Sequence, residues 1–235
     1  MKSSRSKQVR RQFRGPDGRF IKPTYIVIDD FGNVSPYSRK EPTFGYAYSV
    51  TDEPKEMVRL AVDNRRRAGK KVEAKANEDG LWNRVRMSLA IRSLGIRTGA
   101  AYVDKKRPPH GWDVEKNDHE SKKQYRVRKG RVRRGVLEYV IDEALNGTES
   151  YGVMIIVDEH DAVHNVGELC RSKSTDDRKV DGGSFSSSNS RYRDLLQTQD
   201  YVANAAGSAT KGYPLRARSM RMKIHRIRRH ERVKE

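Results

Sequence analysis

Short apolar runs alternate along the chain with stretches of helical periodicity. The runs at 25–28, 43–50 and 151–157 are rich in β-branched or aromatic residues, as strands are, and 100–104 is a shorter candidate strand. Because 151–157 is the most apolar run, we expect it to be a buried central strand. The alternation predicts a mixed α/β sheet flanked by helices.

Helical spacing of apolar residues predicts five helices, at 54–67, 81–94, 131–146, 160–170 and 191–206. The second helix should face inward through Leu81, Val85, Leu89 and Trp82, and the third through Val136, Val140, Ile141 and Leu145. Ser190 or Asn189 is expected to cap the last helix.

Four segments lack a clear strand or helix pattern. Residues 1–22 are predicted to be a basic disordered arm, 105–130 a long excursion, and 181–190 a Gly/Ser loop. In the basic tail 211–235, Met220, Ile224 and Ile227 form a narrow apolar stripe, which suggests an amphipathic helix against the body or a protein partner. We therefore expect one domain at 23–210, with a basic excursion at 105–134 and a basic extension at each end.

The charge is concentrated in three places. The chain of 235 residues has a formal net charge of +19. Residues 1–22 hold eight Lys/Arg against one Asp, 211–235 hold ten against two Glu, and 121–134 hold eight with no acid. The rest of the chain is slightly acidic. This distribution favours nucleic acid as the partner, and it makes the carboxylates retained in the body of interest.

Two features that the sequence lacks indicate the cellular compartment. Cys170 is the one cysteine, so an internal disulfide is excluded and a reducing compartment is expected. No run of about 18 apolar residues occurs, so no membrane association is predicted. We expect a cytoplasmic protein.

Acidic residues follow two of the predicted strands. Asp29 and Asp30 end the first strand, and Asp158 and Glu159 end the strand at 151–157. Ligands of α/β sheets gather beyond the carboxyl ends of strands, so these side chains are expected to face one another, although an acid there can also simply begin a turn. In the last helix Asp200 shares a face with Gln197 and Asn204.

Carboxylate oxygens are ligands for Mg²⁺ or Mn²⁺, and two such ions can activate water and stabilise the leaving oxygen of a phosphodiester. The predicted catalytic and metal-binding residues are Asp29, Glu73, Asp158 and Asp200, with Asp30, Glu159, His160 and Gln197 as secondary candidates. His160 and His164 have the spacing of a zinc pair but lack a third ligand nearby in sequence, so His160 fits better as a proton donor or phosphate contact.

A family resemblance supports this set. The strand YIVIDDFGN from Tyr25, the E-x-K at Glu73, the strand ending at Asp158 and the helix LLQTQDYVANAAG from Leu195 resemble the prokaryotic domain of unknown function 3800 family. The resemblance spans about residues 24–207 and implies a ribonuclease H-like fold with the same four acids at the metal-binding positions. The chain departs from the family pattern at Asp30, Phe31, Asn33 and Gln199.

The basic segments are expected to contact the phosphate backbone, with Tyr125 able to stack on a base. The predicted contact residues are Arg10, Arg11, Arg14, Lys122, Lys123, Tyr125, Arg126, Arg128, Lys129, Arg131, Arg133, Arg134, Arg226, Arg228 and Arg229.

The sequence thus favours a prokaryotic or virus-encoded nuclease that depends on Mg²⁺ or Mn²⁺. The alternatives left open are a non-catalytic scaffold, such as a ribonucleoprotein or viral structural component, and a defence or toxin effector that needs a partner protein. DNA and RNA are both open as substrates.

Overall fold

The structure is a computed structural model that describes residues 13–32, 42–70, 75–107, 121–158, 165–186 and 192–228. The strands are β1 (Phe13–Arg14), β2 (Phe20–Ile21), β3 (Thr24–Gly32), β4 (Thr43–Thr51), β5 (Arg97–Asp104), β6 (Gly152–Asp158), β7 (Lys179–Phe185) and β8 (Lys223–Arg226). The helices are α1 (Pro54–Arg67), α2 (Leu81–Ser93), α3 (Lys122–Leu145), α4 (Val166–Ser172), α5 (Arg193–Thr210) and α6 (Leu215–Ser219).

One mixed sheet of six strands organises the chain, in the order β7-β6-β3-β4-β5-β8. The consecutive strands β3, β4 and β5 are antiparallel, whereas β6 runs parallel to β3 and β7 parallel to β6. The apolar strand β6 therefore lies inside the sheet, as predicted, and its carboxyl end meets that of β3.

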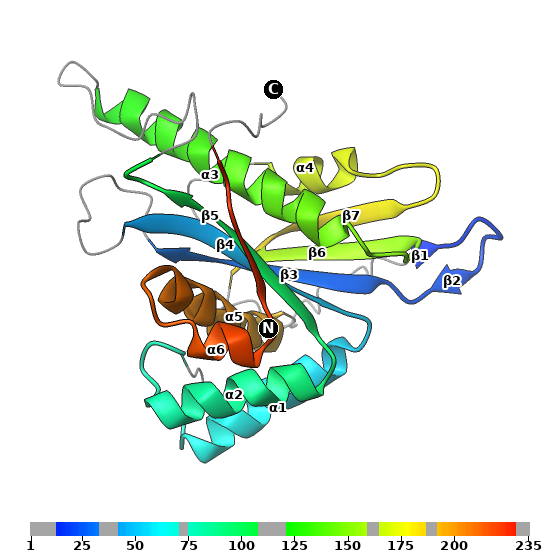
Figure 1. Cartoon of the computed structure of the whole chain (residues 1–235). Coiled ribbons are helices and arrows are strands. Elements are labelled where there is room, and N and C mark those ends of the chain that lie inside the picture. Colours follow the sequence, from blue (N-terminus) through cyan, green and yellow to red (C-terminus); the bar gives the residue numbers. More distant parts are fainter. Residues whose placement is uncertain are drawn as a thin grey trace, which may run out of the picture.

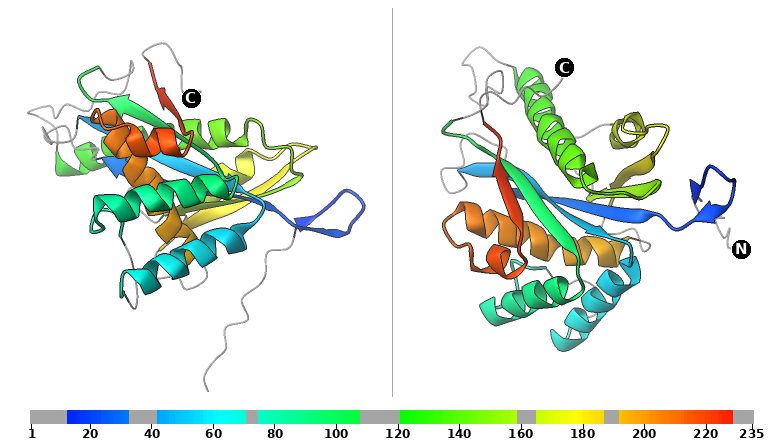
Figure 2. Two further views of the ribbon diagram at one scale, coloured as in Figure 1. Left: turned by 60° about the horizontal axis from the view of Figure 1, so that its bottom comes forward. Right: turned by 45° about the vertical axis from the view of Figure 1, so that its right-hand side comes forward.

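Helices cover both faces of this sheet (Figure 1). Alternate residues of β3 point to opposite faces, so Ile26 and Ile28 belong to the core under α3 and α4, whereas Val27 and Phe31 belong to the core beneath α5. Helices α1, α2 and α6 lie on the α5 side (Figure 2). The mixed α/β sheet with flanking helices is confirmed.

The inward face predicted for 81–94 is wrong, although the helix is present. Met87 and Ile91 are buried, whereas Trp82 is 84% exposed and Leu81 and Leu89 are also exposed. Met87 and Ile91 are four residues apart, the same spacing as Leu81, Val85 and Leu89, so the sequence pattern alone fitted either face of the helix.

The excursion at 105–130 is partly wrong, because 122–130 is helical. The Ser121 side chain accepts a hydrogen bond from the Gln124 backbone N–H, and the Gln124 side chain accepts one from the Ser121 backbone N–H. This capping box begins α3 nine residues earlier than predicted. The four expected inward residues, Val136, Val140, Ile141 and Leu145, are buried.

The loop predicted at 181–190 is also wrong in its first half, since β7 pairs with β6 through Phe185. Gly182 permits this pairing: a Cβ at this position would lie 2.4 Å from the Ile155 carbonyl oxygen and 3.0 Å from Cys170 Sγ. Here glycine marks a close approach of backbone inside a sheet rather than a loop.

The remaining differences concern helix starts and the two ends of the described chain. The helix predicted at 160–170 is α4, which begins at Val166, and α5 is capped at Tyr192 without a side-chain hydrogen bond. Residues 13–21, expected to be disordered, form the β1–β2 hairpin.

The C-terminal stripe is not one helix, because 215–219 is a short helix and 223–226 is the edge strand beside β5. Met220 and Ile227 are buried in the two cores. Among the described residues, no helix has both the length and the apolarity needed to cross a membrane.

Candidate functional site

The carboxyl ends of β3 and β6 bring two of the predicted acids together. Ile28 pairs with Val157 in the parallel register, so the next residues, Asp29 and Asp158, lie side by side where β6 ends, whereas β3 continues to Gly32. The sequence-based expectation that these strand ends are neighbours is therefore confirmed.

Helix α5 supplies the third acid, Asp200, and is fixed over β4 by buried polar contacts. Gln199 accepts a hydrogen bond from Ser49 Oγ (2.6 Å) and donates one to the Ala47 carbonyl (2.8 Å). Thr198 donates to the Met57 carbonyl of α1 at 2.9 Å. Because buried hydrogen bonds are directional, they set the rotation of α5 and thereby aim Asp200 at the end of β3.

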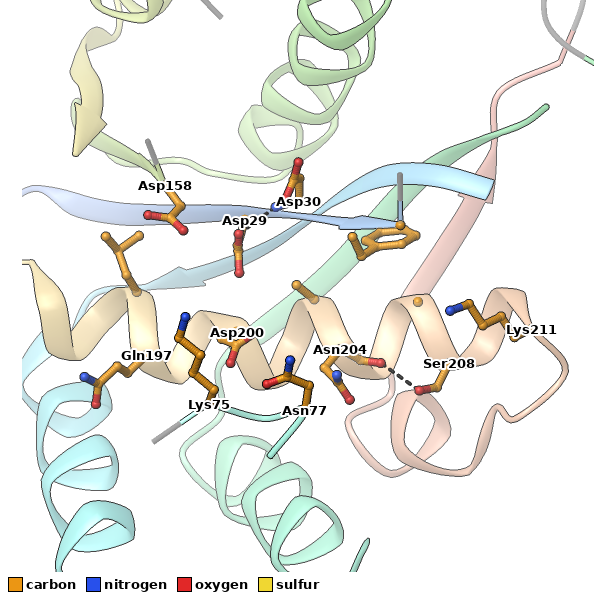
Figure 3. Close-up of a pocket in the computed structure, with 15 residues that line it drawn as sticks. Asp29, Asp30, Lys75, Asn77, Asp158, Gln197, Asp200, Asn204, Ser208 and Lys211 are labelled. Carbon is orange, nitrogen blue, oxygen red and sulfur yellow. Dashed lines mark hydrogen bonds between the residues drawn. The ribbon is translucent and has the colours of Figure 1, made fainter. Parts of the chain in front are cut away.

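A cavity of about 380 Å³ lies between the end of β3 and α5. Its walls include Asp29, Asp158 and Asp200 at one end and Asn204, Ser208 and Lys211 along the C-terminal half of α5. In Figure 3 Asp29 points from β3 toward α5, where Asp200 lies. The cavity is thus acidic at one end and becomes polar and then basic toward the other.

The carboxyl group of Asp29 is the electrostatic centre of the acidic end. Burial raises the pKa of Asp29 well above 3.8, and the charges of Asp158, Asp30 and Asp200 raise it further. Its surface still touches the cavity, so the residue is half-buried rather than inaccessible. The Asp30 backbone N–H, 2.8 Å away, opposes part of the rise by donating to the carboxylate. A bound cation would relieve the same repulsion.

Asp30 points away from Asp29, toward the opposite face of the sheet (Figure 3). Its Oδ2 accepts a hydrogen bond from Arg133 Nη1 at 3.1 Å, and the Arg133 guanidinium lies over the Phe44 ring, 5.1 Å from the centroid. Arg133 is placed differently from the prediction, because it is buried against α3's own core instead of exposed for a phosphate.

The segment before α2 contributes two cavity residues that the sequence did not single out, Lys75 and Asn77. The Ala76 backbone N–H donates to Asp200 Oδ2 at 2.6 Å, and the Tyr201 hydroxyl donates to Asp79 at the other end of the segment. Lys75 points toward the carboxylates in Figure 3. Its place two residues after Glu73, in the E-x-K pattern, was the available signal.

Gln197 and Asn204 line the cavity on the same side of α5 as Asp200, as their spacing predicted. Gln197 is buried and accepts a hydrogen bond from Arg65 of α1. Glu73, Glu159 and His160 lie outside the described residues. Within the described part, no group of three or more His, Cys, Asp or Glu side chains is close enough together to hold a metal ion.

The predicted basic surface lies on the N-terminal half of α3, which extends beyond the sheet (Figures 1 and 2). Five of its basic residues are exposed: Lys122, Lys123, Arg126, Arg131 and Arg134. The Tyr125 ring is already covered by Lys129, whose Nζ is 4.5 Å from its centroid.

The other predicted contacts are dispersed. Arg226 forms a salt bridge with Asp104 at 2.8 Å, and Arg14 lies over the Phe20 ring of the hairpin. Arg228 ends the described chain, whereas Arg10, Arg11 and Arg229 lie outside it.

Comparison with known proteins leaves the site to be interpreted from its own chemistry: no family model, no curated protein and no solved structure matches the chain. The resemblance based on the four motifs stays a prediction.

Proposed function

We propose that the protein is a nucleic-acid-binding phosphodiesterase, dependent on Mg²⁺ or Mn²⁺, with its site between the ends of β3 and β6 and helix α5. The observation that supports it most is the Asp29 carboxyl, which faces the charges of Asp158 and Asp200 in one cavity of a chain with net charge +19. A carboxylate held against other carboxylates is kept at a cost in stability, which points to a cation.

The donor set suits these ions in kind, since carboxylate oxygens are hard ligands. Asp29, Asp158 and Asp200 would hold the metal, and Glu73 would join them as the fourth predicted ligand. A bound divalent ion would lower the pKa of a water molecule and offset charge on the leaving oxygen of a phosphodiester. The strand order, with β3, β4 and β5 antiparallel and β6 and β7 parallel to β3, is compatible with a ribonuclease H-like fold.

The surrounding residues have separate tasks in this proposal. Lys75 and Lys211 supply positive charge to a substrate phosphate, and Asn77 and Asn204 supply amide donors. Asp200 accepts a hydrogen bond from the Ala76 N–H and so holds the segment that carries Lys75. In this proposal Asp200 therefore positions Lys75 as well as binding the metal. The exposed basic residues of α3 would contact the nucleic-acid backbone at a distance from the cavity. Along the helix axis, Lys122 at the start of α3 lies about 16 Å from Arg133.

Two observations favour a non-catalytic nucleic-acid-binding protein instead. The described carboxylates do not by themselves form a three-ligand metal group, and Lys75 points toward them. In that alternative the ammonium group balances the acidic end, and the cavity is a polar binding pocket.

Cleavage assays separate these two functions. Labelled single-stranded RNA and DNA, RNA–DNA hybrid and branched DNA are incubated with the full chain in Mg²⁺, Mn²⁺ or EDTA. We expect metal-dependent cleavage of at least one, abolished in Asp29→Asn and Asp158→Asn with binding retained. Asp63→Asn on the exposed surface of α1 is the charge-matched control. Binding without cleavage in either metal supports the non-catalytic alternative.

A further inference from the structure

Two arginines that have no acidic partner among the described residues lie on α2 and α6, which contact each other and α5. Arg84 belongs to α2 and Arg216 to α6. Both helices contact α5 on the face of the sheet that holds the cavity (Figure 1). Through Arg216 the pair lies behind Asn204 and Ser208, the polar part of the cavity wall that follows Asp200 along α5.

Arg216 is a buried and immobilised cation. It is 6% exposed and donates to Asn204 Oδ1 at 2.6 Å, to the Asn204 carbonyl at 3.4 Å and to Ser208 Oγ. Asn204 and Ser208 also line the cavity. None of these partners is a carboxylate, so the hydrogen bonds orient the guanidinium without neutralising it.

Within the described part of the chain, the Arg84 side chain has no hydrogen-bond or salt-bridge partner, and its Nε is buried. The helices that carry the two arginines, α2 and α6, contact each other. Burial and, to a smaller extent, the charge of Arg84 lower the pKa of Arg216. A half-buried arginine with unsatisfied donors, beside a second buried arginine, is an arrangement that an anion stabilises.

Neither arginine is among the cavity's lining residues, but Asn204 and Ser208, which accept hydrogen bonds from Arg216, connect the pair to the cavity wall. From Gln197 to Lys211 its wall follows α5 for about 20 Å, a length over which several nucleotides of a strand can lie. Tyr213, 74% exposed, precedes by two residues the helix α6 that carries Arg216. Guanidinium donors for phosphate together with a ring for stacking are features of single-strand contacts.

We propose that Arg84 and Arg216 form a second anion site that binds a backbone phosphate of the nucleic-acid strand whose scissile phosphate lies at the acidic end of the cavity. Arg84 contacts the phosphate, Arg216 supplies a fixed positive charge beneath it, and Tyr213 stacks on the adjoining base. The placement of the strand relies on the proposed function, whereas the anion site does not.

The test uses the full chain in EDTA, so that no cleavage occurs. Binding of a fluorescein-labelled single-stranded 20-mer is followed by anisotropy over a series of salt concentrations. Arg84→Gln should weaken binding about tenfold and lower the slope of log K against log salt by about 1. The matched control is Arg92→Gln, which removes the same charge from an exposed position on the same helix and should change affinity less than twofold.

A second measurement isolates the anion site from nucleic-acid binding. Inorganic phosphate should raise the Tm of the wild type more than chloride at the same ionic strength, and this difference should disappear in Arg84→Gln. Without phosphate, Arg84→Gln should melt at or above the wild-type Tm because one of two repelling charges is gone.

Equal binding by Arg84→Gln and Arg92→Gln, together with an unchanged phosphate effect, overturns the proposal. Displacement of the 20-mer by poly-glutamate as effectively as by unlabelled oligonucleotide overturns the assignment to phosphate. Absence of metal-dependent cleavage with the Arg84 effects intact contradicts the proposed function and leaves the anion site standing.

Discussion

Asp29 and Asp30 are neighbours in sequence but face opposite sides of the sheet: Asp29 points into the cavity, and Asp30 accepts a hydrogen bond from the buried Arg133 of α3. The alternation of side chains along β3 causes this division. Both residues line the cavity, but the carboxylate of Asp29 belongs to the candidate site and that of Asp30 to the packing of the opposite layer. Their variants should behave differently.

Asp29→Asn should raise the free energy of unfolding at pH 7 by about 1 kcal/mol, since it removes a carboxylate that burial and other carboxylates disfavour. A raised pKa means that the folded protein holds the proton more tightly. Wild-type stability should therefore fall as pH rises from about 3.8 through the higher pKa of the folded state, and Asn should flatten this fall. Urea unfolding between pH 4 and 8 measures both effects. A loss of stability at pH 7 contradicts the prediction.

Arg133→Met should destabilise the protein by about 2 to 3 kcal/mol, because the partly buried Asp30 carboxylate loses the positive charge of Arg133. Adding Asp30→Asn should recover part of the loss. The double-mutant cycle, measured by denaturant unfolding, gives the coupling energy. Additive effects of the two substitutions would mean that the ion pair contributes nothing.

Gly182→Ala should cost about 2 kcal/mol or more, since the added Cβ would meet the Ile155 carbonyl at 2.4 Å in the neighbouring strand. Gly183→Ala is the matched control, because its Cβ would have only ordinary contacts, at 3.5 Å from the Phe185 ring. Thermal unfolding of the pair of variants distinguishes them. Similar Tm values would contradict the close packing of β6 against β7.

Removing two charges from α3, as in Lys122→Gln with Arg126→Gln, should lower the slope of log K against log salt for nucleic-acid binding by about 2. The control removes two exposed charges from α1, with Arg66→Gln and Arg67→Gln, and should lower it less. Fluorescence anisotropy in EDTA gives both slopes. Equal decreases would show that only net charge matters.

Mn²⁺ should raise the Tm of the wild type by a few degrees at concentrations well above its Kd, because a ligand that binds only the folded state stabilises it. The shift should be absent in Asp158→Asn and kept in Asp63→Asn. Differential scanning fluorimetry checks this without any substrate. A shift of the same size in all three proteins indicates binding elsewhere.

The sequence predicted the end of β6 well because its signal there is local: a β-branched run is followed by Asp158, where the strand ends. The end predicted for the first strand is wrong, because β3 continues past Asp29 and Asp30 to Gly32 in its pairing with β4. The parallel register with β6 still places Asp29 beside Asp158. Likewise, the spacing of Gln197, Asp200 and Asn204 correctly indicated one face of α5. These inferences needed only the periods of strand and helix.

Other features depended on contacts between distant segments. Nothing near Lys75 indicates that its segment is tied to α5 through Asp200 and Tyr201. The glycines of β7 suggested a loop because the close approach of Ile155 that requires Gly182 is a tertiary contact. Arg84 and Arg216 lie 132 positions apart in the sequence, so only the packing of α2 on α6 joins them.

The capping box at Ser121 and Gln124 affects the rate and the entropy cost of binding a polyanion at the start of α3. Because the helical backbone is already closed at its first turn, docking need not nucleate a helix and loses little chain entropy. In the proposed function, this preformed end of α3 would therefore favour rapid first contact with the nucleic acid.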